Sequence, residues 1–146
     1  AIKIDTNGGK PDRLGELIDE CLLDYVAMDF KAPLELYESR VGFRDVYLWR
    51  RSFDCLRQSI VQSELRTTVH PDLLHESEVN EMLDFLECSE FRGSFFLQHF
   101  QQAPRTLGRV ADTSRRFDLG KLNLSRPFKI GCRNFTKSET RVVSRG

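Results

Sequence analysis

The sequence predicts an α/β fold with about four parallel strands, crossover helices and an irregular basic C-terminal tail. Short apolar segments alternate four times with longer segments whose apolar residues recur at helical spacing. Such an alternation favours a parallel sheet with right-handed crossovers. The segment YVAMDF, residues 25–30, is apolar on both faces, which is typical of a parallel strand covered on both sides. The alternation ends at Pro104, so we divide the chain into residues 1–104 and a basic extension, residues 105–146.

The first half of the alternation contains two predicted strands and two predicted helices. The first strand is IKID at residues 2–5, and the turn TNGG follows it. Pro11 then begins a helix, because proline suits the first helical position. The apolar stripe of this helix is Leu14, Leu17, Ile18, Cys21 and Leu22. The second strand, residues 25–30, leads to a helix with the stripe Val46, Trp49, Phe53, Leu56 and Ile60.

The second half repeats the pattern. The third predicted strand is ELRTTV at residues 64–69. The next helix begins near Glu76 and Glu78, since carboxylates stabilise a helix N-terminus. Its apolar stripe is Val79, Met82, Leu83 and Leu86. The fourth strand is SFFLQHF at residues 94–100, and a short strand is also compatible with residues 128–130 of the tail.

Charge is divided unevenly between the two parts of the chain. Residues 1–104 hold 11 Lys and Arg against 19 Asp and Glu, whereas residues 105–146 hold 11 against 3. A basic tail of this kind binds an anionic partner or packs on its own acidic body, and the sequence leaves both interpretations open. The tail matches no nucleic-acid-binding motif, so nucleic acid is the less favoured partner.

Composition predicts a protein of the reducing cytoplasm. No apolar segment approaches the roughly 20 residues needed to span a bilayer, and the chain begins without a secretory signal. It starts inside a strand, which is typical of a fragment. The four cysteines are widely spaced, and three of them, Cys21, Cys55 and Cys88, fall in apolar helical patterns. We therefore interpret these three as small core residues rather than metal ligands.

Polar residues follow the predicted strands at their carboxyl ends, where α/β proteins bind ligands. Asp5 ends the first strand, Asp29 and Lys31 follow the second, and Arg66 lies in the third. The two aspartates suit acid–base chemistry or a cation with hard oxygen ligands. Each residue alone also fits a turn cap or a solvated charge. The pattern predicts a ligand site for a carboxylate, an amine or a cation.

Four segments together resemble a known family. IDTNG, LDYVAMDFKAP, LRTTVHP and FFLQHF are similar, in order and spacing over residues 2–104, to the second half of radical S-adenosylmethionine activating enzymes. The likeness is greatest to anaerobic ribonucleoside-triphosphate reductase activating proteins, with pyruvate formate-lyase activating enzyme more distant. The resemblance implies a partial (β/α) barrel, a 4Fe-4S cluster and bound S-adenosylmethionine. Reductive cleavage would give a 5′-deoxyadenosyl radical that abstracts hydrogen from a glycine of a glycyl-radical enzyme.

The resemblance also implies roles for individual residues. Asp5, Thr6 and Asp29 match positions that hold a monovalent cation beside the carboxylate of S-adenosylmethionine. Lys31 and Arg66 match positions that contact S-adenosylmethionine. The backbone around Val69 would border the nucleoside, and Gln98 is a further candidate contact.

The chain departs from the family at the cluster motif. The motif CxxxCxxC and the Gly-Gly-Glu segment are absent. We therefore expect the C-terminal portion of an activating enzyme, which by itself assembles no cluster and is inactive. The alternative is a non-catalytic α/β module that docks a protein or nucleic acid through its basic–aromatic tail. A small independent phosphate- or nucleotide-binding α/β domain is a third interpretation. Because an open half-barrel exposes a strand edge, we expect the chain to dimerise or aggregate through the edge of the first strand, residues 2–5.

Overall fold

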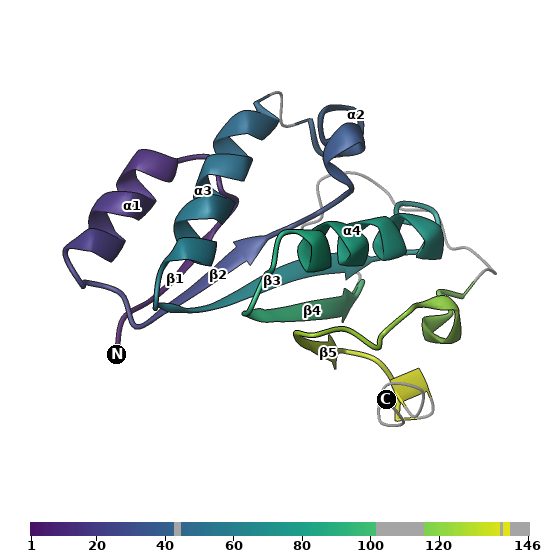
Figure 1. The fold of residues 1–146 in the computed structure, drawn as a ribbon. Helices are drawn as coiled ribbons and strands as arrows, with labels where there is room; N and C mark the ends of the chain where they lie inside the picture. Colours follow the sequence, from purple (N-terminus) through teal and green to yellow (C-terminus); the bar gives the residue numbers. More distant parts are fainter. Residues whose placement is uncertain (43–44, 102–115, 138, 141–146) are drawn as a thin grey trace.

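The computed structural model of the chain describes residues 1–42, 45–101, 116–137 and 139–140. Within these residues, five parallel strands form a sheet in the order β1-β2-β3-β4-β5 (Figure 1). The strands are β1 (Lys3–Thr6), β2 (Tyr25–Asp29), β3 (Gln62–Val69), β4 (Ser94–His99) and β5 (Lys129–Arg133). The helices are α1 (Pro11–Asp19), α2 (Tyr37–Val41), α3 (Val46–Gln58) and α4 (Glu76–Cys88), with the short 3-10 turns η1 (Leu34–Leu36) and η2 (Leu119–Lys121). No helix in the described part is long and apolar enough to cross a bilayer.

The predicted α/β class with parallel strands is confirmed. The first four strands correspond to the four apolar segments of the sequence. The tail adds a fifth strand, because β5 pairs in parallel with β4 near the residues where a short strand was compatible with the sequence. This pairing satisfies backbone groups that β4 would otherwise expose at a sheet edge. The tail is therefore not irregular throughout.

The core lies between the sheet and one layer of helices. Helices α1, α3 and α4 lie on the same face of the sheet (Figure 1). The fully buried core side chains include Val26, Met28, Leu65, Phe95 and Leu97 from the strands, and Trp49, Met82, Leu83 and Leu86 from the helices. β2 was predicted to be covered on both sides. The three helices cover one side, and Ala27, which points to the other side, is fully buried as well.

Successive side chains of a strand point to opposite faces, and polar side chains gather on the face away from the helices. We call this the open face of the sheet. Its residues include Lys3, Asp5, Tyr25, Asp29, Glu64, Arg66, Thr68, Phe96, Gln98 and Arg133.

Some predicted core residues lie outside the core. Helix α1 ends at Asp19, and Cys21 adopts a φ of 55°, so the chain turns before Cys21 and Leu22 can join the apolar stripe. Both residues are exposed. Ile60 lies beyond the end of α3 and is fully exposed as well. Cys88, the last residue of α4, is also exposed, so the core assignment is wrong for Cys21 and Cys88, whereas Cys55 is partly buried against the core.

The described part of the tail packs on the acidic body of the protein. The Arg126 side chain is 6% exposed and forms ion pairs with Asp84 and Glu87 of α4. Arg133 on β5 forms a bidentate ion pair with Glu64 on β3. Of the two interpretations of the charge division, these contacts support internal packing.

Candidate functional site

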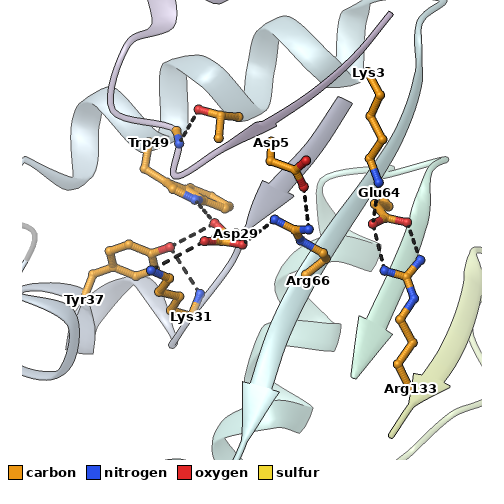
Figure 2. A network of polar contacts seen from close by, with 11 residues as sticks. Lys3, Asp5, Asp29, Lys31, Tyr37, Trp49, Glu64, Arg66 and Arg133 are labelled. Atoms are coloured by element: carbon orange, nitrogen blue, oxygen red, sulfur yellow. Dashed lines mark hydrogen bonds and ion pairs between the residues drawn. The ribbon is translucent and has the colours of Figure 1, made fainter. Parts of the chain in front are cut away.

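Three charged side chains of β1, β2 and β3 converge on the open face of the sheet, near the carboxyl ends of β1 and β2. Asp29 and Arg66 are register partners on neighbouring strands, and Asp5 lies one strand further out. The Arg66 guanidinium lies between the two carboxylates, with Nη1 2.5 Å from Asp5 Oδ1 and Nη2 3.1 Å from Asp29 Oδ1 (Figure 2). Lys31 Nζ is 3.5 Å from the second oxygen of Asp29. The strand ends therefore hold a compact set of alternating charges.

These four side chains are reachable from solvent to different degrees. Arg66 is 20% exposed and Asp29 29%, whereas Lys31 is 49% and Asp5 56% exposed. The inner pair is shielded and the outer pair faces water. An arrangement with both signs of charge within hydrogen-bond reach suits a zwitterionic ligand, because each of its charged groups finds an opposite partner.

The position of Asp29 is fixed through its backbone. Trp49 Nε1 donates a hydrogen bond of 2.7 Å to the Asp29 carbonyl, and the Tyr37 hydroxyl donates a longer one of 3.3 Å (Figure 2). Tyr37 also accepts a hydrogen bond from the Lys31 amide at 3.2 Å. Burial raises the pKa of Tyr37, so its hydroxyl remains a donor at neutral pH. Phe30, between the two charged residues, stacks on Trp49 with ring centroids 4.6 Å apart.

Helix α3 also fixes the turn after β1. The Ser52 hydroxyl donates a 2.8 Å hydrogen bond to the Gly8 carbonyl. Gly8 has a φ of +78°, and a Cβ atom there would lie 2.7 Å from Trp49 Cδ1. The Gly8 amide donates to the Thr6 hydroxyl at 3.1 Å. Through Trp49 and Ser52, one helix therefore anchors the ends of both β1 and β2.

The structure brings together Asp5, Asp29, Lys31 and Arg66 of the residues predicted for the site. The Thr6 hydroxyl is instead engaged in the turn, and its role as a cation ligand stays a prediction. Val69 is fully buried, and its carbonyl accepts a hydrogen bond from the Phe100 amide at 3.1 Å. Gln98 is partly buried on β4, two residues beyond the register partner of Arg66. The roles proposed for Val69 and Gln98 therefore also stay predictions.

A pocket of about 150 Å³ adjoins the charged set. Its lining residues are Asn7, Lys31, Tyr37, Val41 and Gly42. Lys31 thus borders both the pocket and Asp29. The pocket offers space for part of a ligand whose charged end contacts the strand ends.

Sequence reasoning missed a second polar cluster on the open face, centred on Glu64. The Glu64 side chain is 2% exposed. Its carboxylate accepts hydrogen bonds from Arg133 Nη1 at 3.0 Å, from Arg133 Nη2 at 2.7 Å and from the Tyr25 hydroxyl at 2.7 Å. Lys3 Nζ lies 4.0 Å away (Figure 2). The sequence feature that could have revealed this cluster is the polar residue at every second position of the third strand, Glu64, Arg66 and Thr68. Such spacing indicates a polar face of the strand.

The pKa values in this cluster follow from burial and hydrogen bonding. Burial disfavours the ionised form of Glu64, but the hydrogen bonds from Arg133 and Tyr25 outweigh it, so the pKa of Glu64 lies below its usual value. Burial, together with the hydrogen bond to Glu64, raises the pKa of Tyr25 to about 12. Glu64 is therefore an anion and Tyr25 a neutral donor at neutral pH.

The cysteines of the chain do not fit a metal cluster. They lie after α1, on α3, at the end of α4 and on β5, and in the described ranges no three His, Cys, Asp or Glu side chains gather as metal ligands. Asp5 and Asp29 supply the hard oxygen atoms that a monovalent cation requires, and Arg66 lies between them. The residues present thus fit a cation and a charged ligand, but not an iron–sulfur cluster.

Part of the chain is similar to a protein whose name refers to the activation of glycyl-radical enzymes. A protein of Methanocaldococcus jannaschii, named "Putative glycyl-radical enzyme activating enzyme MJ1227", is 33% identical over 86 residues, or 56% of this chain. The chain spans 36% of the length of that relative. No family model matches the chain, and no solved structure matches it.

Proposed function

We propose that the chain is the C-terminal portion of a radical S-adenosylmethionine activating enzyme, and that its strand ends bind S-adenosylmethionine. The observation that carries this proposal is the set formed by Asp5, Asp29, Lys31 and Arg66, in which Arg66 of β3 joins charges of the other sign at the carboxyl ends of β1 and β2. The similarity to an activating enzyme supports the same class of activity. The glycyl-radical partner that we propose is anaerobic ribonucleotide reductase, on the resemblance of the four strand-end segments.

The residues of this chain would bind and orient the cofactor. Lys31 and Arg66 are the donors for its carboxylate, and Asp5 and Asp29, with Thr6, would hold a monovalent cation beside it. Val69 and Gln98 would contact its nucleoside and neighbouring groups. When bound in the complete enzyme, the cofactor supplies the radical that takes hydrogen from a glycine. The cluster that reduces it would need ligands other than the four separated cysteines of this chain.

The alternative of a binding module with a free basic tail receives less support. In the described part of the tail, Arg126 and Arg133 are already paired with carboxylates of the body. Arg133 also stacks on Phe96, with its guanidinium carbon 3.7 Å from the ring centroid. These two arginines are therefore not available for phosphate contacts without loss of internal pairs.

Lys31→Ala tests the proposed site. A charge-assisted hydrogen bond contributes about 1.5–3 kcal/mol, so the affinity of the complete enzyme for S-adenosylmethionine should fall about ten- to hundredfold. The melting temperature should change little, because Lys31 is half exposed and its partner Asp29 retains Arg66. Isothermal titration of the reconstituted enzyme measures the affinity.

Leu36→Ala is the control, since Leu36 lies close in sequence but in η1, away from the strand ends. Leu36→Ala should leave the affinity for S-adenosylmethionine nearly unchanged. If Lys31→Ala binds like the wild type and melts at a clearly lower temperature, the pair with Asp29 is structural and the proposed site is wrong.

A further inference from the structure

A cavity of about 360 Å³ opens at the amino ends of β2, β3 and β4. The first residues of these strands, Tyr25, Gln62 and Ser94, line it together with the last turn of α3 and the loop before β4. Its volume falls within the range of small-molecule sites. The charged set of the proposed function lies toward the carboxyl ends of β1 and β2, and none of its residues lines this cavity. The cavity is therefore a separate candidate site.

The charged side chains that line this cavity are both basic. Arg57 lies in the last turn of α3 and Arg92 in the loop before β4, and no described Asp or Glu lines the cavity. The surrounding body is acidic, because residues 1–104 hold 11 Lys and Arg against 19 Asp and Glu. A concave surface lined by one sign of charge concentrates ligands of the other sign. The cavity therefore favours an anion.

Several hydrogen-bond donors of the cavity are free to contact a ligand. Arg57 Nη2 is 3.2 Å from Asp54 Oδ1, in the same helix, so this guanidinium is partly engaged. Arg92 has no hydrogen-bond or ion-pair partner among the described residues. The hydroxyls of Ser63 and Ser94, which also line the cavity, have none in this part of the chain either.

Gly93 brings the loop that carries Arg92 against the start of β3. A Cβ atom at residue 93 would lie 2.6 Å from the Ser63 carbonyl oxygen and 2.5 Å from Phe91 Cζ. Both distances are too short for a carbon atom, so the loop can approach β3 this closely only without a side chain at residue 93. The close approach places Arg92 and Ser63 on the wall of the same cavity.

The remaining walls of the cavity are largely apolar. Leu56 and Phe91 line it from the core and are almost fully buried. Ile60, which follows α3, lines it from outside and is fully exposed. A ligand with an apolar body would therefore cover Ile60 while its anionic group contacts the arginines.

The donors of the cavity suit a phosphate better than a carboxylate. A phosphate monoester carries a charge of about −1.5 to −2 at neutral pH and offers three acceptor oxygens, whereas a carboxylate offers two. Two guanidinium groups and two hydroxyls supply donors for all three oxygens. We propose that this cavity binds a small phosphate monoester with an apolar body, which Arg57 and Arg92 hold by the phosphate and Ile60 contacts at the body. This site is independent of the proposed function.

A titration of the full chain with phenyl phosphate tests the site. The amide NMR signals of Ser63 and Gly93 are followed as phenyl phosphate replaces sodium chloride at constant ionic strength, and they should shift to saturation. Arg92→Gln should weaken the affinity about ten- to hundredfold, because a charge-assisted hydrogen bond to the phosphate is lost. Arg92 is exposed and unpaired in the described chain, so this variant should keep the fold.

Arg13→Gln is the matched control, because Arg13 is also an exposed arginine but lies on α1 and does not line the cavity. It should bind phenyl phosphate like the wild type. Signals that do not saturate in the wild type would overturn the site, as would equal affinities of the wild type and Arg92→Gln. Shifts at the Asp29 and Lys31 amides in place of Gly93 would also overturn it, because the anion would then bind at the strand ends.

Two further probes test the class of ligand. Benzoate should bind more weakly than phenyl phosphate, and equal affinities would overturn the preference for phosphate. Ile60→Ser should weaken phenyl phosphate at least about threefold through the lost apolar contact and leave inorganic phosphate unchanged. An equal effect on both phosphates would overturn the role of Ile60. Arg92→Gln should leave the affinity of the complete enzyme for S-adenosylmethionine unchanged, so this site and the proposed function succeed or fail separately.

Discussion

Glu64 illustrates at the scale of one residue how a buried charge is tolerated on an open sheet face. Removing a carboxylate from water is costly, and the cost is offset only if donors of good geometry replace the water. Around Glu64, the Arg133 guanidinium donates two hydrogen bonds to the carboxylate and the Tyr25 hydroxyl donates a third. Because the folded pKa of Glu64 lies below its unfolded value of about 4.3, the ionised carboxylate stabilises the folded state.

Glu64→Gln should lower the free energy of unfolding by about 1–3 kcal/mol at pH 7, since an amide replaces a charged acceptor. The stabilisation by Glu64 is present above its unfolded pKa and is lost as the pH falls through its folded pKa. The difference between wild type and variant should therefore shrink below about pH 4. Urea unfolding at pH 7 and at acid pH measures both effects.

Glu81→Gln serves as the control because Glu81 is exposed on α4. It should change the free energy of unfolding by less than about 0.5 kcal/mol at either pH. A Glu64→Gln difference that is the same at both pH values would show that the carboxylate charge contributes nothing to stability.

At the scale of an element, helix α3 anchors the chain at the ends of β1 and β2. Trp49 contacts the Asp29 carbonyl and the surface of Gly8, while Ser52 contacts the Gly8 carbonyl. The turn after β1 therefore fits against α3 only if residue 8 lacks a side chain and adopts a positive φ. This fit holds the turn that follows β1 against α3.

Gly8→Ala should destabilise the protein more than Gly42→Ala. Both glycines have positive φ values, +78° and +69°, which cost a residue with a Cβ about 1–2 kcal/mol. Only at residue 8 would the new methyl group also meet Trp49, at 2.7 Å, whereas among the described residues no atom lies within 4 Å of a Cβ at residue 42. Thermal unfolding of the two variants measures the difference, and equal melting temperatures would show that Trp49 does not restrict the turn.

At the scale of the whole molecule, the sheet of the described chain has an edge at β1. This strand pairs only with β2 within the described residues, and Ile2 beside it is 55% exposed. An open parallel edge offers unpaired backbone groups to another chain. We therefore predict that the chain dimerises or aggregates through residues 2–5.

Ile2→Lys should reduce this association, because a charge on an edge strand disfavours edge-to-edge pairing. Ile60→Lys is a matched control: Ile60 is fully exposed and lies after α3, away from the β1 edge. Sedimentation velocity over a range of concentrations measures the effect. A wild-type chain that remains monomeric at high concentration would contradict the prediction, as would equal effects of the two substitutions.

Local patterns of the sequence determined the strands and the amphipathic helices. They also indicated the end of the sheet at which charged side chains gather. The alternation of apolar segments and helical stripes predicted β1 to β4 and helices α1, α3 and α4, because a strand or an amphipathic helix is encoded by the spacing of nearby residues. The short helix α2 was not predicted. The same patterns placed Asp5 and Asp29 at strand ends and Arg66 within the third strand. They were misleading at Cys21 and Ile60, where the apolar spacing continued past the residue at which the helix ends.

Only the tertiary structure decided which charges pair. Arg66 contacts Asp5 across 61 positions of sequence, and Arg133 contacts Glu64 across 69. Trp49, which the sequence marks only as a core residue, also bonds to the carbonyl of Asp29. Such contacts depend on strand order, on register and on the face that each side chain occupies. Local periodicity fixes none of these between distant segments, because strand order and register are set when the helices and strands pack around a common core.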